Sequence, residues 1–173
     1  MSSLEDNTKA GRALRLAYPS MRDALLKELA PSFAITRQAL ATPEDSNLTQ
    51  FSYKYQLPTS PTPLKWLGMT DVDGTDYRTH PFLIEGSYLY CDLTEAYMRY
   101  VYQETSVLKF PEAFISALYL SLAAEIAYHI TGNVRPDIAG EAVVALGIAK
   151  KDNAIQTMTN RRPSQSWASI RRS

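Results

Sequence analysis

The stretch PEAFISALYLSLAAEIAYHITG, residues 111–132, decides the fold that this chain is expected to adopt. Its apolar residues run almost all round a helical wheel, which predicts a helix buried on more than one side. Pro111 suits the start of that helix, Glu112 its first turn, and Gly132 its C-terminal cap. We therefore expect this helix to form the core, with other helices packed against it.

Other helices are predicted before and after this stretch. Over residues 8–29 apolar side chains recur at helical spacing, and the pattern keeps its phase across Pro19, which favours one helix kinked at that proline. A last helix is expected from Pro136-Asp137 towards Thr157. A short helix is also expected over Ser32 to Leu40, followed by a turn-rich loop over residues 42–47.

The period changes from helical to two between Phe51 and Gln103, which predicts strands. Four or five antiparallel strands are expected, over residues 51–57, 64–69, 82–84, 88–91 and 97–102. The predicted fold class is α+β: a helical bundle with a small antiparallel β-sheet inserted at about residues 51–103, and an extended C-terminal tail. The folded body is expected to span residues 1–159, and the tail residues 160–173.

Charge is balanced in number but uneven along the chain. There are 18 basic and 18 acidic residues, and the tail holds four arginines and no acid. Subtracting these four leaves 14 basic against 18 acidic residues in the body, which is therefore mildly acidic. The tail is too polar to fold alone, and its only large apolar residues are Trp167 and Ile170.

No pattern in the sequence assembles a catalytic or metal site, and we expect no enzyme activity, cofactor or metal. The carboxylates of residues 71–76 do not have the spacing of an EF-hand loop, which favours a solvated turn. Glu125 and His129 stand one helical turn apart, but a polar pair at a subunit contact or in a wet core explains them better than catalysis. Cys91, the only cysteine, is expected to be buried packing. The apolar stretch from Phe114 to Ile130 contains polar residues, so no membrane span is expected.

Eleven tyrosines are many for 173 residues, and six of them fall in the region of predicted strands. One interpretation is a sheet whose rings pack against the helices. The other is that rings on the second face pack against a neighbouring copy, because tyrosine is enriched at interfaces. The candidates for that subunit interface are Tyr53, Tyr55, Tyr97 and Tyr100.

Several segments, in this order, resemble the phage tail tubular protein A and head-tail adaptor family of podovirus-type tails. Arg15–Leu26 is similar to the family's first helix, with its Tyr-Pro step and Arg-Asp pair. Phe51–Pro58 resembles an aromatic strand ending in Leu-Pro, and Phe82–Asp92 resembles a Val-Glu-Gly hairpin. Phe110–Gly132 resembles the family's buried Ala/Leu helix. The likeness covers about residues 10–155, with departures at Ser32-Phe33 and in the Pro-rich stretch over residues 59–63.

The resemblance implies a non-enzymatic virion protein that forms a ring, with twelve copies surrounding a DNA channel. Its partners would be the portal above and a tail nozzle or tube protein below, with DNA passing through unspecifically. It would lie at the head-tail interface of the virion, after assembly in the host cytoplasm. The tail is then expected to dock on the portal, with aromatic and aliphatic anchors and arginine forks for carboxylates. Its docking residues are Arg161, Arg162, Trp167, Ile170, Arg171 and Arg172.

Three alternatives stay open at this point. The tail could be unstructured without a docking role. The chain could be a small nucleic-acid-binding protein that uses its basic tail, although one aromatic residue in that tail and an acidic body argue against it. It could also be an enzyme with an unrecognised fold, if Glu125, His129, His80 or Cys91 converged in one pocket.

Overall fold

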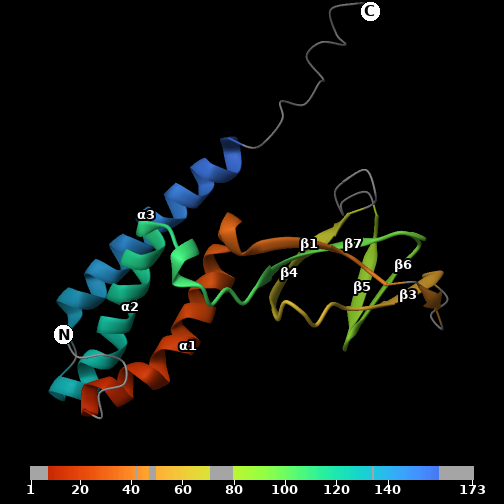
Figure 1. Ribbon diagram of the computed structural model, residues 1–173. Coiled ribbons are helices and arrows are strands. Elements are labelled where there is room, and N and C mark those ends of the chain that lie inside the picture. Colours follow the sequence, from red (N-terminus) through yellow and green to blue (C-terminus); the bar gives the residue numbers. More distant parts are fainter. Residues whose placement is uncertain (1–7, 42, 47–49, 71–79, 134, 160–173) are drawn as a thin grey trace, which may run out of the picture.

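The chain folds into a layer of three helices from which two small antiparallel sheets project, as Figure 1 shows. The predicted α+β class is confirmed. The computed structural model describes residues 8–41, 43–46, 50–70, 80–133 and 135–159. The helices are α1 (Lys9–Leu29), α2 (Glu112–Thr131) and α3 (Pro136–Thr159). The proposed docking tail lies outside the described residues.

The first helix is continuous through Pro19, as its unbroken apolar phase predicted. Thr8 caps its start, where the Thr8 hydroxyl oxygen accepts a hydrogen bond from the Gly11 N–H at 3.1 Å. The helix ends at Ala30, which adopts a left-handed conformation with φ 43° and donates its N–H to the Leu26 carbonyl. Pro31 follows, and a ring at that position cannot continue the helix.

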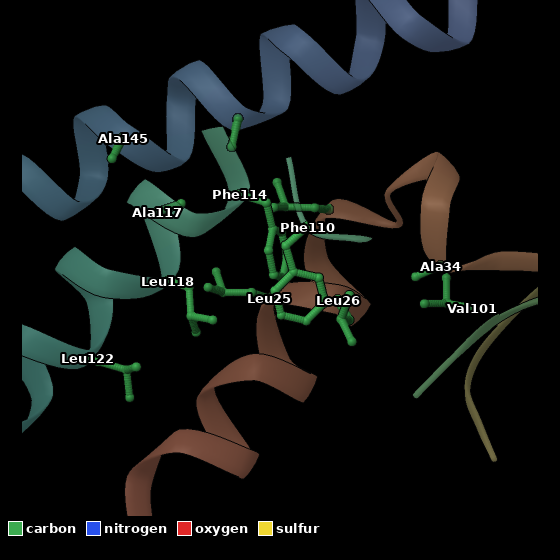
Figure 2. Packing of buried hydrophobic residues seen from close by; sticks show 12 residues of the cluster. Leu25, Leu26, Ala34, Val101, Phe110, Phe114, Ala117, Leu118, Leu122 and Ala145 are labelled. Carbon is green, nitrogen blue, oxygen red and sulfur yellow. The ribbon is translucent and has the colours of Figure 1, made fainter. Parts of the chain in front are cut away.

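The second helix is the centre of the helical core, as predicted. It packs against α1 and α3, and Figure 2 shows its Phe114, Leu118 and Leu122 in the same cluster as Leu25 and Leu26 of α1. From α3 come small residues, among them the buried Ala145 and Ala149. Small side chains on α3 let the α2 and α3 axes lie close together. Gly132 ends α2 in the left-handed region with φ 74°, also as predicted.

Three rings fix the start of α2 against the start of the β region. The Phe33 ring lies 5.6 Å from that of Phe110 and 5.3 Å from that of Phe114, between ring centroids. Phe110 and Phe114 are themselves 4.9 Å apart and meet edge to face. The residues before α2 form the short 3₁₀ helix η3 (Val107–Lys109), which carries Phe110 into this cluster.

The helix predicted over Ser32 to Leu40 is wrong. Only η1 (Ser32–Ala34) is helical there, and strand β1 (Ile35–Ala39) follows it. The expected loop over residues 42–47 likewise contains strand β2 (Glu44–Asp45). Nine residues are too few to distinguish a helical spacing of apolar residues from the alternation of a strand. Here pairing with the distant strand β7 decides for the strand. Ile35 lies opposite Val101, and Ala39 opposite Tyr97.

The other strands fall where alternation predicted them, and the five strands over residues 51–103 agree with the expected four or five. The single predicted sheet is wrong, because β1 and β2 precede that region and the strands form two sheets. Seven strands within the described residues make two sheets, ordered β1-β7-β4 and β2-β3-β6-β5. The remaining strands are β3 (Tyr53–Gln56), β4 (Pro63–Thr70), β5 (Phe82–Glu85), β6 (Tyr88–Cys91) and β7 (Tyr97–Tyr102). All pairings are antiparallel.

Strand β7 belongs to two hydrophobic cores at once. Met98 and Tyr100 are fully buried in the core between the two sheets, whereas Val101 is fully buried in the helical core. Neighbouring residues of a strand point to opposite faces, so one strand can contribute to both. Ile35 of β1, opposite Val101, also packs against the helical core. The β insertion is therefore joined to the helices by packing as well as by the chain.

A buried carboxylate reinforces the joint after β7. Glu104 accepts hydrogen bonds from the Lys109 ammonium at 2.6 Å, the Ser106 N–H at 2.9 Å and the Tyr102 hydroxyl at 2.9 Å. Burial raises the pKa of Glu104, but these donors, with Lys109 foremost, outweigh burial and lower it from 4.5 to about 2. Nearby, Asp23 of α1 accepts from Arg22 at 2.8 Å and from the Gln103 amide at 2.6 Å, which ties α1 to the same segment.

Replacing Glu104 with Gln is expected to lower the free energy of unfolding by about 1–3 kcal/mol at neutral pH, because buried donors lose a charged acceptor. The folded-state pKa of about 2 lies below the ordinary 4.5, so the carboxylate's contribution is complete above pH 4.5 and is lost as pH falls towards 2. Urea unfolding of both proteins across that pH range measures the difference. If the free energy of unfolding depends on pH equally in both proteins, the lowered pKa of Glu104 and its stabilising role are contradicted.

Candidate functional site

The residues considered for catalysis do not converge. Within the described part of the chain, no group of three or more His, Cys, Asp or Glu side chains could hold a metal ion. Glu125 and His129 are exposed on α2, where they border a shallow hollow with Lys9, so the wet-core interpretation of this pair is wrong. Cys91 is fully buried in the sheet core, as predicted, and burial raises the pKa of its thiol. The thiolate form of Cys91 is thereby disfavoured.

The tyrosines proposed as a subunit interface divide into two pairs. Tyr55 and Tyr100 are fully buried between the two sheets, and their hydroxyls donate to the Leu93 carbonyl at 2.6 Å and to the Gln38 side chain at 2.7 Å. Neither ring can reach a neighbouring copy, so the interface assignment is corrected for both. The rings pack between sheets rather than against helices. Tyr53 and Tyr97 are half-buried, and their interface role stays a prediction.

A Tyr55→Phe variant tests this correction. Loss of the 2.6 Å hydrogen bond leaves the part-buried Leu93 carbonyl with only the weak thiol donor of Cys91 at 3.9 Å, so we expect the free energy of unfolding to fall by about 1 kcal/mol. The mass of any assembly that the protein forms should not change. Thermal unfolding and analytical ultracentrifugation measure the two quantities. A change in assembled mass with unaltered stability would return Tyr55 to the interface.

An uncovered apolar groove lies on the helical layer. It opens between α1 and α2 and continues onto η3. Tyr119, Val107 and Ile115 expose 68%, 56% and 43% of their surface, values more typical of polar side chains. We define the α1/α2 groove by Leu14, Tyr18, Val107, Ile115, Tyr119 and Ile126. Contiguous exposed apolar surface of this kind marks an interaction site.

A second apolar surface lies on α3. Its Ala142, Ala145 and Ala149 are buried, while Val144, Ile148 and Ile155 are each more than half exposed. Val144 lies on the far side of the helix, whereas Ile148 lies on its flank and lines a hollow with Glu112 of α2. We define the α3 stripe as Gly140, Val144, Gly147, Ile148, Lys151 and Ile155. A side chain added at either glycine would meet nothing within 4 Å in this chain.

The two glycines have no explanation in the folded monomer. A glycine inside a helix costs about 1 kcal/mol relative to alanine. Since packing within the chain requires no small residue at Gly140 or Gly147, this cost is unexplained unless another surface approaches the helix closely at these positions.

The second helix, α2, is more apolar than its burial within the chain would require. With 20 residues and a mean hydropathy of 1.4 over its most apolar 18-residue stretch, α2 is long and apolar enough to cross a membrane. Only 28% of that stretch is buried in the structure. Core helices of soluble proteins pass the same test, and α2 packs between two helices as a core helix does. The expectation of no membrane span stays a prediction. Part of the exposed surface of α2, at Ile115 and Tyr119, lines the groove.

Sequence reasoning missed both surfaces. The apolar pattern over residues 111–132 predicted a helix buried on more than one side, but it did not indicate which side of that helix stays uncovered in the folded chain. The signal that could have revealed the α3 stripe is the spacing of Gly140, Val144, Gly147 and Ile148, which places small and aliphatic residues on the side away from the buried alanines. The predicted docking residues of the tail lie outside the described residues.

No family model matches this chain, and no curated protein matches it in sequence. The resemblance to the adaptor family therefore rests on the residues quoted above.

Proposed function

We propose that this chain is a structural, non-enzymatic virion protein, a subunit of the adaptor ring that joins the portal to the tail and surrounds the DNA channel. One observation carries the proposal: the helical layer exposes large apolar side chains both in the α1/α2 groove and on the α3 stripe. A chain that leaves this much aliphatic surface uncovered gains stability by association. The virion location, the twelve copies and the identity of the partners follow from the resemblance alone.

The arrangement of the two parts supports an adaptor role. The apolar surfaces belong to the helical layer, while the sheets project away from it and hold their own core (Figure 1). One part can therefore make lateral contacts while the other is left available for a partner above or below. The acidic excess of the body also suits a channel through which DNA passes, because like charge prevents tight binding of phosphates.

A small nucleic-acid-binding protein is the second candidate. It is favoured by the first half of α1, where Lys9, Arg12 and Arg15 are exposed and no acid is present. Together with the four arginines of the tail they could neutralise several phosphates. The exposed apolar surfaces have no purpose in this alternative, since phosphate binding needs charge rather than aliphatic side chains.

The first test mixes the full-length chain with the assembled cognate portal and compares it with a chain truncated after Thr159. We expect the full-length chain to add to the portal as a ring and the truncated chain to bind at least tenfold more weakly, because the tail supplies the aromatic anchor. Mass photometry measures both. Portal binding by neither chain, with a salt-sensitive shift of the full-length chain on DNA, would replace the adaptor proposal by the nucleic-acid alternative.

A further inference from the structure

We propose that the α3 stripe of one copy lies in the α1/α2 groove of the next copy, so that a head-to-tail contact between two different surfaces builds the ring. This inference rests on the proposed assembly function and names the contact that performs it. The groove is lined by α1, α2 and η3, whereas the stripe lies on the exposed surface of α3, with Ile148 at its edge next to the start of α2. The two surfaces therefore occupy different sides of the helical layer.

Because the α3 stripe and the α1/α2 groove are two different surfaces, their contact determines the symmetry of the assembly. A contact between one surface and its own copy would close a dimer, but a contact between two unlike surfaces repeats and closes into a ring when the rotation allows it. Successive copies in a large ring are related by a small rotation. The α3 helix of the neighbouring copy then runs in nearly the same direction as the α3 helix of the copy that it contacts. Within each copy α3 is antiparallel to α2, so the neighbour's α3 also meets α2 in an antiparallel direction.

Charge complementarity supports a second copy as the occupant. Lys151 lies on the α3 stripe, and Glu112 lies at the start of α2, one turn before Ile115 of the groove; both are exposed. Within the described residues neither of them pairs with another charge, although the neighbouring Lys150 pairs with Glu28 at 2.8 Å. Glu112 itself lines a neighbouring hollow with Ile148 and Asp152 of its own chain. No lysine or arginine is present on α2, so its side of the contact offers only carboxylates and one histidine. An incoming Lys151 finds its opposite charge at Glu112.

One antiparallel register satisfies both the charges and the shapes. When Lys151 is placed beside Glu112, equal steps along the two helices bring Ile148 beside Ile115 and Val144 beside Tyr119. The next turn brings Gly140 beside Ala123, two small residues that let the helix backbones approach. The exposed glycine that has no role inside the monomer thus meets the smallest residue of the groove.

Disulfide trapping tests the contact without requiring the portal. A chain carrying both Tyr119→Cys and Val144→Cys is oxidised under native conditions beside each single variant. Native Cys91 does not react, because it is fully buried. We expect the double variant to give a ladder of covalent multimers on a non-reducing gel. An equimolar mixture of the two single variants should stop at two chains, since only one bond can form per pair.

The control pair combines Val144→Cys with Tyr88→Cys, which is exposed on β6 outside both surfaces. The crosslinking rate of this control pair measures random collisions between chains. It should be at least roughly tenfold lower than the rate of the Tyr119→Cys and Val144→Cys pair. Charge reversal adds a second measurement. Lys151→Glu in the double-cysteine chain should slow the ladder severalfold, and adding Glu112→Lys should restore it.

Each result has a definite meaning. Rapid dimers from Val144→Cys alone would replace the inference by a symmetric contact between two α3 helices. If no variant crosslinks faster than the control pair, the inference is wrong, whatever the wild-type chain does with the portal. Failure of the wild-type chain to bind the portal while the ladder forms would instead contradict the adaptor function and leave the self-contact intact.

Discussion

The packing of α2 is the constraint on which the rest of the structure depends. This helix is apolar almost all round, and water penalises each side that stays uncovered. The chain covers one side with α1 and another with α3, through a short connection that makes α2 and α3 an antiparallel pair. No further helix is available within the described residues for the third side, so it forms the floor of a groove. Association with another surface is the remaining way to remove it from water.

Strand β7 determines how the β insertion is held. Because it buries Tyr100 on one face and Val101 on the other, neither core can shift without disturbing the second. The polar contacts of Glu104 and Asp23 lie where this strand leads back to the helices. Buried charges are tolerated there because each has several donors, and their geometry fixes the direction in which the sheets project from the helical layer.

An adaptor needs a body that presents fixed surfaces to several neighbours, and this fold separates them. Both uncovered apolar surfaces lie on the helical layer, where the proposed lateral contacts would form, while the sheets bury Tyr55 and Tyr100 between them. Because Tyr55 and Tyr100 are buried, the proposed self-contact is placed on the helices, while Tyr53 and Tyr97 remain predicted interface residues on the sheets. In the described part of the chain Cys91 is fully buried, while Glu125 and His129 are exposed one helical turn apart on α2 and border one hollow.

The sequence by itself determined the three helices, most of the strands and the burial of Cys91, because these follow from local periodicity and from caps such as Gly132. Only the tertiary structure decided that Ser32 to Leu40 turns into strand β1, since pairing with β7 outweighs local preference. It also decided which apolar residues stay outside. Apolarity indicates that Ile115 or Ile148 must leave water, but the number of helices available to cover them is a property of the whole fold.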